Sequence, residues 1–207
     1  IGTRHNLHAR QVLAALQAGK HVFCEKPLCL NEQELGEICI AYRDSNAVLM
    51  VGFNRRFAPM VRQMREFFAG VPEAKVIQVR VNAGALPISS WIQDPAQGGG
   101  RILGEVCHFV DLVQYLAGSR VKRVYARALP NQGKYADDNL AITLEFSDGS
   151  VGQISYVANG DRSLGKERVE MFCGGATAVR PTSRGRRSTT DRERTCRACA
   201  PGPCLRW

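Results

Sequence analysis

The sequence places a lysine beside a carboxylate where a short apolar segment stops. Residues 22–24 are apolar, and Glu25, Lys26 and Pro27 follow directly. Because proline cannot continue a strand, the charged pair falls at the carboxyl end of a predicted strand. Ligands of open α/β sheets bind in the crevice beyond these ends. Lys26 could therefore reach a ligand, with Glu25 as the carboxylate that holds it, and the alternative is a surface ion pair.

A second set of residues could move a proton. Glu105, His108 and Asp111 are spaced three residues apart, so on a helix a carboxylate can orient the imidazole and tune its pKa toward neutrality. Such a histidine could exchange a proton with a substrate hydroxyl. The alternative is a polar helix stripe that meets water. The Glu-x-x-His spacing also suits a metal, but one such motif without a partner is weak evidence, and we expect no metal.

An arginine pair and a glycine triplet are less specific signals. Arg55 and Arg56 could grip a phosphate or carboxylate bidentately, or could be solvated beside a linker. The triplet at 98–100 precedes the helix that carries His108. No strand directly precedes the triplet, so we interpret it as a flexible entry to that helix rather than an anion site.

The elements expected to position Lys26 lie in the first 52 residues. Apolar spacing predicts a helix over 9–18, and residues 21–24 and 48–52 form apolar strands, the second of the kind buried on both faces. Asn31 can cap a second helix, with Glu34 as its capping-box partner. The stripe expected to be buried on this helix is Leu35, Ile38 and Ala41 or Tyr42. This order predicts a Rossmann remnant, the second half of a doubly wound parallel sheet.

After residue 54 the pattern changes to an α+β domain with a mainly antiparallel sheet. The predicted helices cover 60–68 and 102–116, and the predicted strands cover 76–81, 121–129, 139–146, 152–159 and 167–172. Asp148-Gly149 between two apolar segments is a strong hairpin signal. We therefore expect a dinucleotide-binding half over 1–54 and a substrate and oligomerisation domain over 55–175.

The last 32 residues differ from the rest of the chain. The 207 residues carry a net charge of +9, and residues 176–207 hold eight arginines against two acidic residues. The segment has few large apolar side chains, so we expect a disordered basic tail. An out-of-frame reading of GC-rich coding DNA would also produce it. Nucleic-acid binding is a weaker alternative, because only Trp207 could stack on bases. Cys196, Cys199 and Cys204 lack the second pair of a zinc site.

Composition and cysteine usage indicate an ordinary intracellular protein. Hydrophobic residues make up 44% and charged residues 23% of the chain, and no apolar segment reaches the roughly 18–20 residues of a membrane span. The five cysteines before residue 176 sit in apolar segments at irregular spacings, as reduced buried thiols do, so we expect a cytoplasmic location. The chain opens with Ile1 rather than a signal peptide, and we expect the natural N-terminus to lie upstream.

Taken together, four motifs resemble the glucose-fructose oxidoreductase / inositol dehydrogenase / MocA family over about residues 1–175. They are, in order, Thr3-Arg4-His5-Asn6-Leu7-His8, Gly19-Lys20-His21-Val22-Phe23-Cys24-Glu25-Lys26-Pro27, Gly52-Phe53-Asn54-Arg55-Arg56-Phe57, and Gly98-Gly99-Gly100 with His108 and Asp111. The resemblance implies NAD or NADP on a Rossmann domain and hydride transfer from a secondary alcohol of a sugar, cyclitol or sugar-nucleotide.

The resemblance also implies roles for single residues. The catalytic residues would be Lys26 and His108, with Glu105 as the nearest orienting carboxylate. Cofactor contacts would come from Thr3, His8, Glu25, Lys26, Pro27, Arg55 and Arg56. Substrate contacts would come from Lys26, Asn54, Trp91 and His108. We expect a homo-oligomer that binds a small molecule, and neither nucleic acid nor a membrane.

Two departures from the family pattern stand out. Gly104 occupies the position of the family's usual Asp, four residues before the histidine. The Gly-x-Gly-x-x-Gly turn that cradles the pyrophosphate would precede Ile1 and is not in the sequence. The chain therefore resembles an internal piece of a dehydrogenase. The alternative function is a non-catalytic fragment or assembly module that lacks the dinucleotide-anchoring turn.

Overall fold

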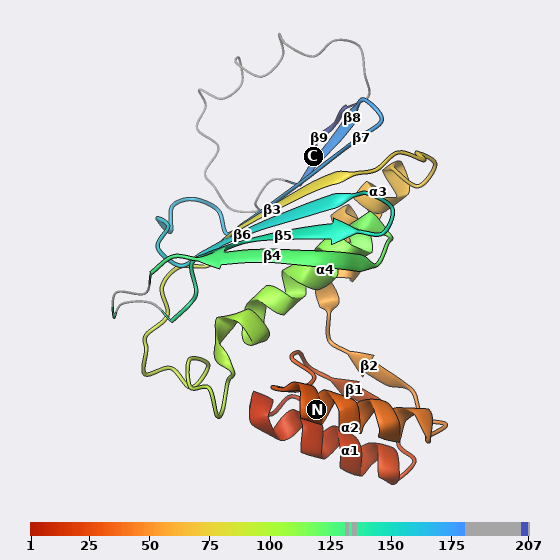
Figure 1. Ribbon diagram of the computed structural model, residues 1–207, viewed down its shortest axis with the longest axis vertical. Helices are drawn as coiled ribbons and strands as arrows, with labels where there is room; N and C mark the ends of the chain where they lie inside the picture. Colours follow the sequence, from red (N-terminus) through yellow and green to blue (C-terminus); the bar gives the residue numbers. More distant parts are fainter. Residues whose placement is uncertain (131–132, 134–135, 181–203, 207) are drawn as a thin grey trace. The chain divides into compact units, whose positions relative to one another are not determined.

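The chain folds into two compact units in the computed structural model (Figure 1), which describes residues 1–130, 133, 136–180 and 204–206. The first unit comprises Ile1–Arg56, Leu86–Leu112 and Leu129–Asp138. The second comprises Phe57–Ala85, Val113–Ala128 and Asn139–Trp207. Each unit is therefore built from three separate segments of the chain.

The first unit begins with the α/β pattern expected from the sequence. Its elements are η1 (His5–Leu7), α1 (His8–Gln17), β1 (Val22–Cys24), α2 (Glu32–Arg43) and β2 (Leu49–Val51). Strands β1 and β2 are parallel, with Val22 opposite Leu49. A Rossmann-like parallel sheet is thus confirmed.

Helices α1 and α2 cover one face of this sheet. The core between them consists of Ala9, Val12, Leu16, Val22, Cys24, Ile38 and Ala47. On the opposite face Phe23 and Met50 are 53% and 41% exposed, so the prediction of burial on both faces is wrong here. Of the stripe predicted for α2, Ile38 is buried and Ala41 packs partly buried against the core, as expected. The prediction is wrong at Leu35, which is exposed, and the alternative Tyr42 is exposed as well.

The capping interaction of α2 follows the sequence closely. The Asn31 side chain accepts a hydrogen bond from the Glu34 backbone N–H at 2.9 Å. The Glu34 carboxylate accepts in return from the Leu30 N–H at 2.8 Å, one residue before the position expected in a capping box. Two backbone donors at this end of the chain's second helix are thereby satisfied.

The remainder of the first unit leads into the helix that carries His108. After the short η2 (Asn54–Phe57), residues of the Leu86–Leu112 segment form the π-helical η3 (Ile102–Val106), which continues directly into α4 (Cys107–Ala117). The sequence predicted one α-helix over 102–116. The first turn is instead π-helical, a geometry often found at functional sites.

The second unit is a mixed sheet in the order β4-β5-β6-β3-β7-β8-β9, preceded by α3 (Pro59–Phe67). Its strands are β3 (Val76–Asn82), β4 (Val121–Ala128), β5 (Leu140–Phe146), β6 (Val151–Val157), β7 (Glu167–Cys173), β8 (Ala176–Arg180) and β9 (Cys204–Arg206). The predicted hairpin joins β5 to β6 through Gly149, whose φ of 85° suits glycine. In the middle of the sheet β3 and β6 are parallel.

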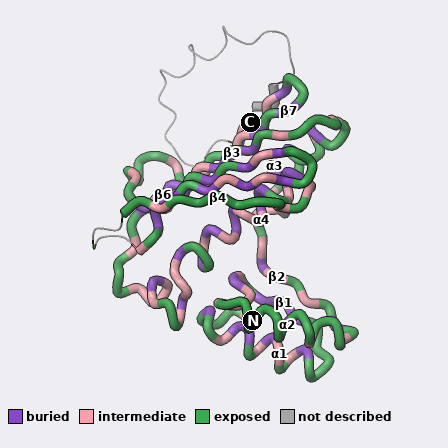
Figure 2. Tube along the Cα trace, viewed as in Figure 1, coloured by how far each residue is buried: buried purple, intermediate pink, exposed green. Residues whose placement is uncertain are grey.

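One face of this sheet is apolar and buried, and the other is open. Ile77, Val79 and Val81 of β3 point to the buried face, where each is at most 2% exposed. On β4, Val124 and Tyr125 belong to opposite faces, and both are more than half exposed. Figure 2 shows this strand green along nearly its whole length.

The prediction that the disordered tail begins at residue 176 is wrong, because residues 176–180 form β8. This strand pairs antiparallel with β7, and positive φ angles at Gly174 and Gly175 allow the turn between them. The sequence reading overlooked β8 because its buried side chains, Ala176 and Ala178, are small. Strand β9 pairs with β8, and residues 181–203 and 207, including Cys196 and Cys199, lie outside the described residues. Within the described part of the chain, no helix has the length and apolar character of a membrane span.

Candidate functional site

Lys26 contacts the helix that carries His108. It follows β1, in a loop where the Lys26–Pro27 peptide bond is cis. Its Nζ donates a hydrogen bond of 2.5 Å to the carbonyl oxygen of Gly104. Gly104 lies in the π-helical η3, four residues before His108. The lysine and the histidine, 82 positions apart in the sequence, are thus brought to the same part of the first unit.

His108 lies near the start of α4 and is 6% exposed. Its ring meets the Phe53 ring edge to face, with centroids 6.2 Å apart. Burial raises the pKa of the neighbouring Cys107 thiol to about 11, although the positive charge of Lys26 opposes the shift. The thiol is therefore protonated at neutral pH. The opposing effect of Lys26 shows that its positive charge acts on the start of this helix.

The two carboxylates expected to orient His108 each have an arginine partner. Glu105 accepts a hydrogen bond from Arg101 at 2.9 Å. Both oxygens of Asp111 accept from the guanidinium of Arg56. The prediction assumed α-helical spacing, but Glu105 lies in the π-helical η3 and His108 in the α-helix that follows.

The arginine pair after β2 contacts protein groups. Arg56 makes the bidentate carboxylate contact that its residue type favours, and the carboxylate is Asp111. Arg55 lies over the ring of Phe109, with its guanidinium carbon 4.5 Å from the centroid. Both arginines therefore contact the first turns of α4, and their expected contact with a cofactor stays a prediction.

His5 is a buried site residue to which the sequence reading gave no role. Its Nδ1 is 2.7 Å from the Gly98 carbonyl oxygen, and its ring meets Trp91 edge to face at 4.8 Å. Burial lowers its pKa, and the positive charges of Lys26 and His8 add to the effect. The sequence signal was the spacing of His5 and His8, three residues apart in one motif.

The glycine triplet makes a tight turn rather than the flexible entry predicted. A Cβ on Gly98 would lie 2.4 Å from Ile92 Cα, so this position has no room for a side chain. The N–H groups of Gly98 and Gly100 bond the carbonyls of Asp94 and Ile92. Gly104 is also confined, because an added Cβ would lie 3.1 Å from His5 Cε1.

His8 connects two loops of the site. The side chain is 1% exposed. Its Nδ1 is 2.7 Å from the Pro27 carbonyl oxygen, and its Nε2 is 3.0 Å from that of Thr3. Thr3 Oγ1 donates to Gln11 at 2.9 Å. His8 thus joins the loop of Thr3 to the loop that follows Lys26.

A buried polar cluster lies beyond Glu105. Arg101 is 5% exposed and approaches Asp138 at 3.5 Å as well as Glu105. Gln93 donates to Asp138 at 3.4 Å. Sequence reasoning missed this cluster, although the four-residue spacing of Arg101 and Glu105 was a usable signal. In the described part of the chain no group of three or more His, Cys, Asp or Glu residues could hold a metal.

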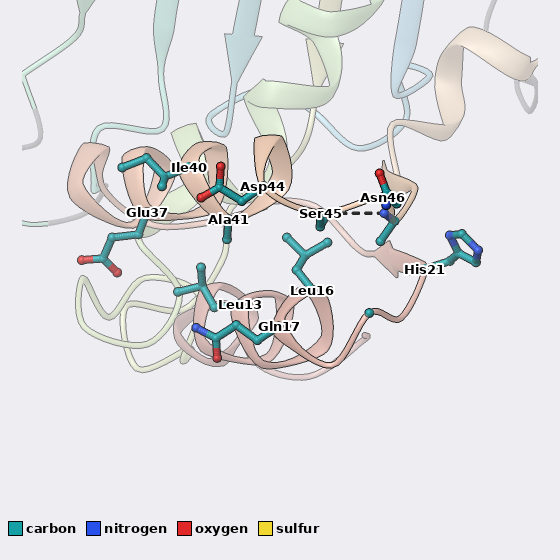
Figure 3. A pocket seen from close by; sticks show the side chains of 12 residues that line it. Leu13, Leu16, Gln17, His21, Glu37, Ile40, Ala41, Asp44, Ser45 and Asn46 are labelled. Carbon is teal, nitrogen blue, oxygen red and sulfur yellow. Dashed lines mark hydrogen bonds between the residues drawn. The ribbon is translucent and has the colours of Figure 1, made fainter.

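A separate groove of about 880 Å³ lies between α1 and α2 (Figure 3). Its walls include Leu13, Leu16, Ile40 and Ala41, and Glu37 and Asp44 line it from the side of α2. None of the residues that line it is a predicted site residue. The groove is therefore distinct from the site around Lys26.

Comparison with family models assigns both parts of the chain to one family. Residues 1–53 match the model described as "Oxidoreductase family, NAD-binding Rossmann fold". Residues 72–179, more than half of the chain, match the "GFO/IDH/MocA C-terminal domain".

Individual relatives agree with these models. Myo-inositol 2-dehydrogenase of Thermotoga maritima is 30% identical over 176 residues, which cover 81% of this chain and 51% of the relative. The uncharacterized oxidoreductase YrbE of Bacillus subtilis is 30% identical over 187 residues, covering 86% and 53%. A solved structure of levoglucosan dehydrogenase with NADH and L-sorbose is 26% identical, with a TM-score of 0.73 and coverage of 86% and 52%. The chain thus spans about half the length of the curated relatives it matches.

Proposed function

Because the chain belongs to the GFO/IDH/MocA family of oxidoreductases, we propose that the protein oxidises a secondary alcohol of a sugar, cyclitol or sugar-nucleotide and passes the hydride to NAD or NADP. The observation that carries this proposal is the hydrogen bond from Lys26 to Gly104, one helical turn before His108. It brings an ammonium group next to the helix that presents an imidazole. The names of the relatives, an inositol and a levoglucosan dehydrogenase, support the substrate class.

Two side chains of this chain, those of His108 and Lys26, would act on the substrate hydroxyl. An imidazole nitrogen of His108 removes the proton of the substrate hydroxyl. The Lys26 ammonium stabilises the negative charge that develops on that oxygen. An ammonium has three donors, so the bond to Gly104 leaves others for the substrate. NAD or NADP, when bound, supplies the hydride acceptor.

The described residues fit the nicotinamide end of such a cofactor. The Ile1 N–H donates to the Phe23 carbonyl and the Glu25 N–H donates to the Ile1 carbonyl, so residues 1–3 run beside the end of β1. Thr3 and Lys26 therefore stand in neighbouring loops at the carboxyl end of a parallel strand, where ligands of such sheets bind. No Gly-x-Gly-x-x-Gly turn occurs in this sequence, so we assign no pyrophosphate contact to this chain.

Turnover of site variants tests the proposal. Formation of NADH or NADPH would be measured with polyols such as myo-inositol and levoglucosan, on the 207-residue chain and on a chain completed with any coding sequence upstream of Ile1. We expect His108→Asn and Lys26→Met to reduce turnover by about 10²–10⁴-fold. Lys20→Met, at an exposed lysine after α1, is the control. Unchanged turnover in His108→Asn would remove the mechanism.

A dinucleotide titration separates this proposal from a non-catalytic assembly module. Trp91 belongs to the first unit and contacts His5, so its fluorescence reports on the site once Trp207, the other tryptophan, is replaced by Phe. Saturable quenching by NAD or NADP that weakens in Lys26→Met supports the enzyme. Turnover and binding that are both absent in the completed chain support the module.

We also propose a cytoplasmic homo-oligomer without a nucleic-acid or membrane partner. The open face of the second unit's sheet carries the exposed apolar side chains of Val76, Tyr125 and Phe172, and a second copy could cover them. Cys24 is a free, buried cysteine, as thiols in a reducing compartment are. Sedimentation of wild type and Tyr125→Glu tests the association, and an unchanged monomer in both would exclude it.

A further inference from the structure

A groove of about 300 Å³ lies on the open face of the second unit's sheet, over β3 and the two strands beside it. Gln153 and Ser155 of β6 line one side of this groove, and Arg168 and Glu170 of β7 line the other. Arg80 of β3 lies between them. Small-molecule sites begin at a volume of about 300 Å³. The groove therefore has room for a small ligand.

Two arginines of this groove are directly opposite each other. Arg80 of β3 is in register with Arg168 of the antiparallel β7, so both side chains belong to the same face. Like charges in this arrangement destabilise a sheet. Arg80 donates a hydrogen bond to the Gly165 carbonyl oxygen at 3.3 Å. Among the described residues no carboxylate forms an ion pair with Arg80.

The acidic residue of the groove balances only one of these charges. The Glu170 carboxylate accepts a hydrogen bond from Arg168 at 2.8 Å. Two arginines and one glutamate leave the groove with a net charge of +1. Because a guanidinium has five N–H donors, Arg168 can bind Glu170 and still donate to a second anion. An anion placed between the two arginines would offset the repulsion between them.

Neutral donors lie next to Arg80. Ser155 of β6 is the register neighbour of Arg80 on the side away from β7, and its hydroxyl can donate to an anion. Gln78 donates to Gln153 at 3.2 Å. In such a pair the NH₂ group of the accepting amide is not used in the bond, whichever of the two amides donates. The groove thus offers hydroxyl and amide donors beside two guanidinium groups.

We propose that this groove binds the phosphate group of a small molecule, with Arg80 and Arg168 as its charged donors and the neutral donors of β6 beside them. A phosphate group carries a charge of about −1.5 to −2 at neutral pH and three strong acceptor oxygens. It therefore suits two arginines better than a carboxylate does, since a carboxylate has one charge and two oxygens. The proposal does not depend on the function of Lys26 and His108, because the groove belongs to the second unit.

The groove lies away from the apolar end of the same face. Val76 and Phe172 are in register with each other. Each lies four residues along its strand from the arginine of that strand, a distance of about 13 Å at the usual rise of a strand. A second copy that covers the apolar end therefore need not fill the groove. If an acidic side chain of a second copy did fill it, phosphate would compete with association.

Isothermal titration calorimetry with inorganic phosphate, on the 207-residue chain in low-salt buffer, tests the site. We expect saturable binding to wild type that weakens at least roughly tenfold in Arg80→Gln, as loss of a bond between charged groups predicts. Arg123→Gln is the matched control, because Arg123 is an exposed arginine of the same face that pairs with Glu145. Its affinity should equal that of wild type. Both variants keep the arginines after residue 180, so phosphate binding there produces no difference between them.

Equal affinity of wild type and Arg80→Gln, or no saturation of wild type below about 10 mM phosphate, would overturn the proposal. Arg168→Gln is a second variant with the same expectation, and circular dichroism verifies that each variant folds. Titration with glucose 6-phosphate and with glucose identifies the source of the group. Tighter binding of the sugar phosphate than of inorganic phosphate supports a phosphate monoester, and equal binding supports the free ion.

Sedimentation with and without phosphate tests the alternative occupant. We expect the oligomeric state of wild type to be the same in both conditions and in Arg80→Gln. A dimer that phosphate dissociates and that Arg80→Gln also lacks would show that a second copy fills the groove, and would overturn the proposal.

Discussion

The sheet of the second unit and the loops around Lys26 in the first unit are stabilised by different kinds of contact. In the sheet, alternate apolar side chains such as Ile154 and Met171 are at most 1% exposed, so burial of apolar surface dominates. Around Lys26, the contacts are hydrogen bonds from His5, His8 and Lys26 itself to backbone carbonyls. Truncation of a buried apolar side chain leaves a cavity among many contacts, whereas loss of a polar contact leaves a single partner unsatisfied. The two regions should therefore respond differently to substitution.

The largest effect is expected in the sheet. Ile154→Ala removes a side chain that is 1% exposed, and the free energy of unfolding should fall by about 2–5 kcal/mol, because a cavity is left in the core. Val124→Ala, on the same face of the sheet but 59% exposed, should change it by less than about 0.5 kcal/mol. Chemical denaturation followed by circular dichroism measures both, and equal losses would contradict the comparison.

The next effect is expected in the first unit, at the carboxylate of Asp111. Asp111→Asn weakens the bidentate contact with Arg56 at a side chain that is 9% exposed, and should cost about 1.5–3 kcal/mol. Trp91 fluorescence during denaturation would report it. Glu145→Gln breaks the exposed pair with Arg123 in the second unit and should cost at most about 1 kcal/mol. A larger loss in Glu145→Gln would reverse the expected order.

A smaller effect is expected at the start of α2. Asn31→Ala removes the acceptor of the Glu34 N–H and should lower the free energy of unfolding by about 1 kcal/mol. Asn31→Asp keeps an oxygen acceptor and should restore most of the loss. Thermal denaturation of the three proteins checks this, and a loss in Asn31→Asp equal to that in Asn31→Ala would show that the cap does not act through this bond.

The smallest effect is a dependence of stability on pH. Because the pKa of His5 is lowered in the folded state, mainly by burial, the unfolded chain binds the proton more readily. The His5 contribution to stability is therefore fully present above the unfolded value of about 6.5, and is lost as the pH falls toward the lowered folded value. His5→Gln should lose less stability than wild type over this range. If the stability of His5→Gln falls with pH as steeply as that of wild type, His5 is not the source of this pH dependence.

The fold could be read from the sequence where side-chain periodicity follows burial. Strands β3, β5, β6 and β7 follow the predicted segments to within a residue or two, because their buried side chains alternate with exposed ones. The predicted burial of Leu35 was wrong because the sequence of a helix does not show which of its sides packs against another element. Strand β8 was missed because alanines fill its buried positions.

Only part of the site could be predicted from the sequence. Lys26 and His108 were singled out by charge and position, and the structure brings Lys26 to the helix of His108. His5 and Arg101 were not assigned roles, because their partners are distant in sequence. The His5 partner, Gly98, is 93 positions away, and nothing in the local pattern around either residue predicts the pair. Contacts to backbone carbonyls leave no signal in residue type, since every residue has a carbonyl.

The parallel pairing of β3 with β6 has a consequence for the order in which the chain can fold. Val76 is opposite Val151, and the other neighbour of β3 is β7, whose residues come later still. A ribosome that has released β3 must therefore make α4, β4 and β5 before either edge of β3 finds a partner. Pairing across such long separations slows folding and leaves strand edges open in the meantime. The newly made chain would be most prone to aggregation in that interval.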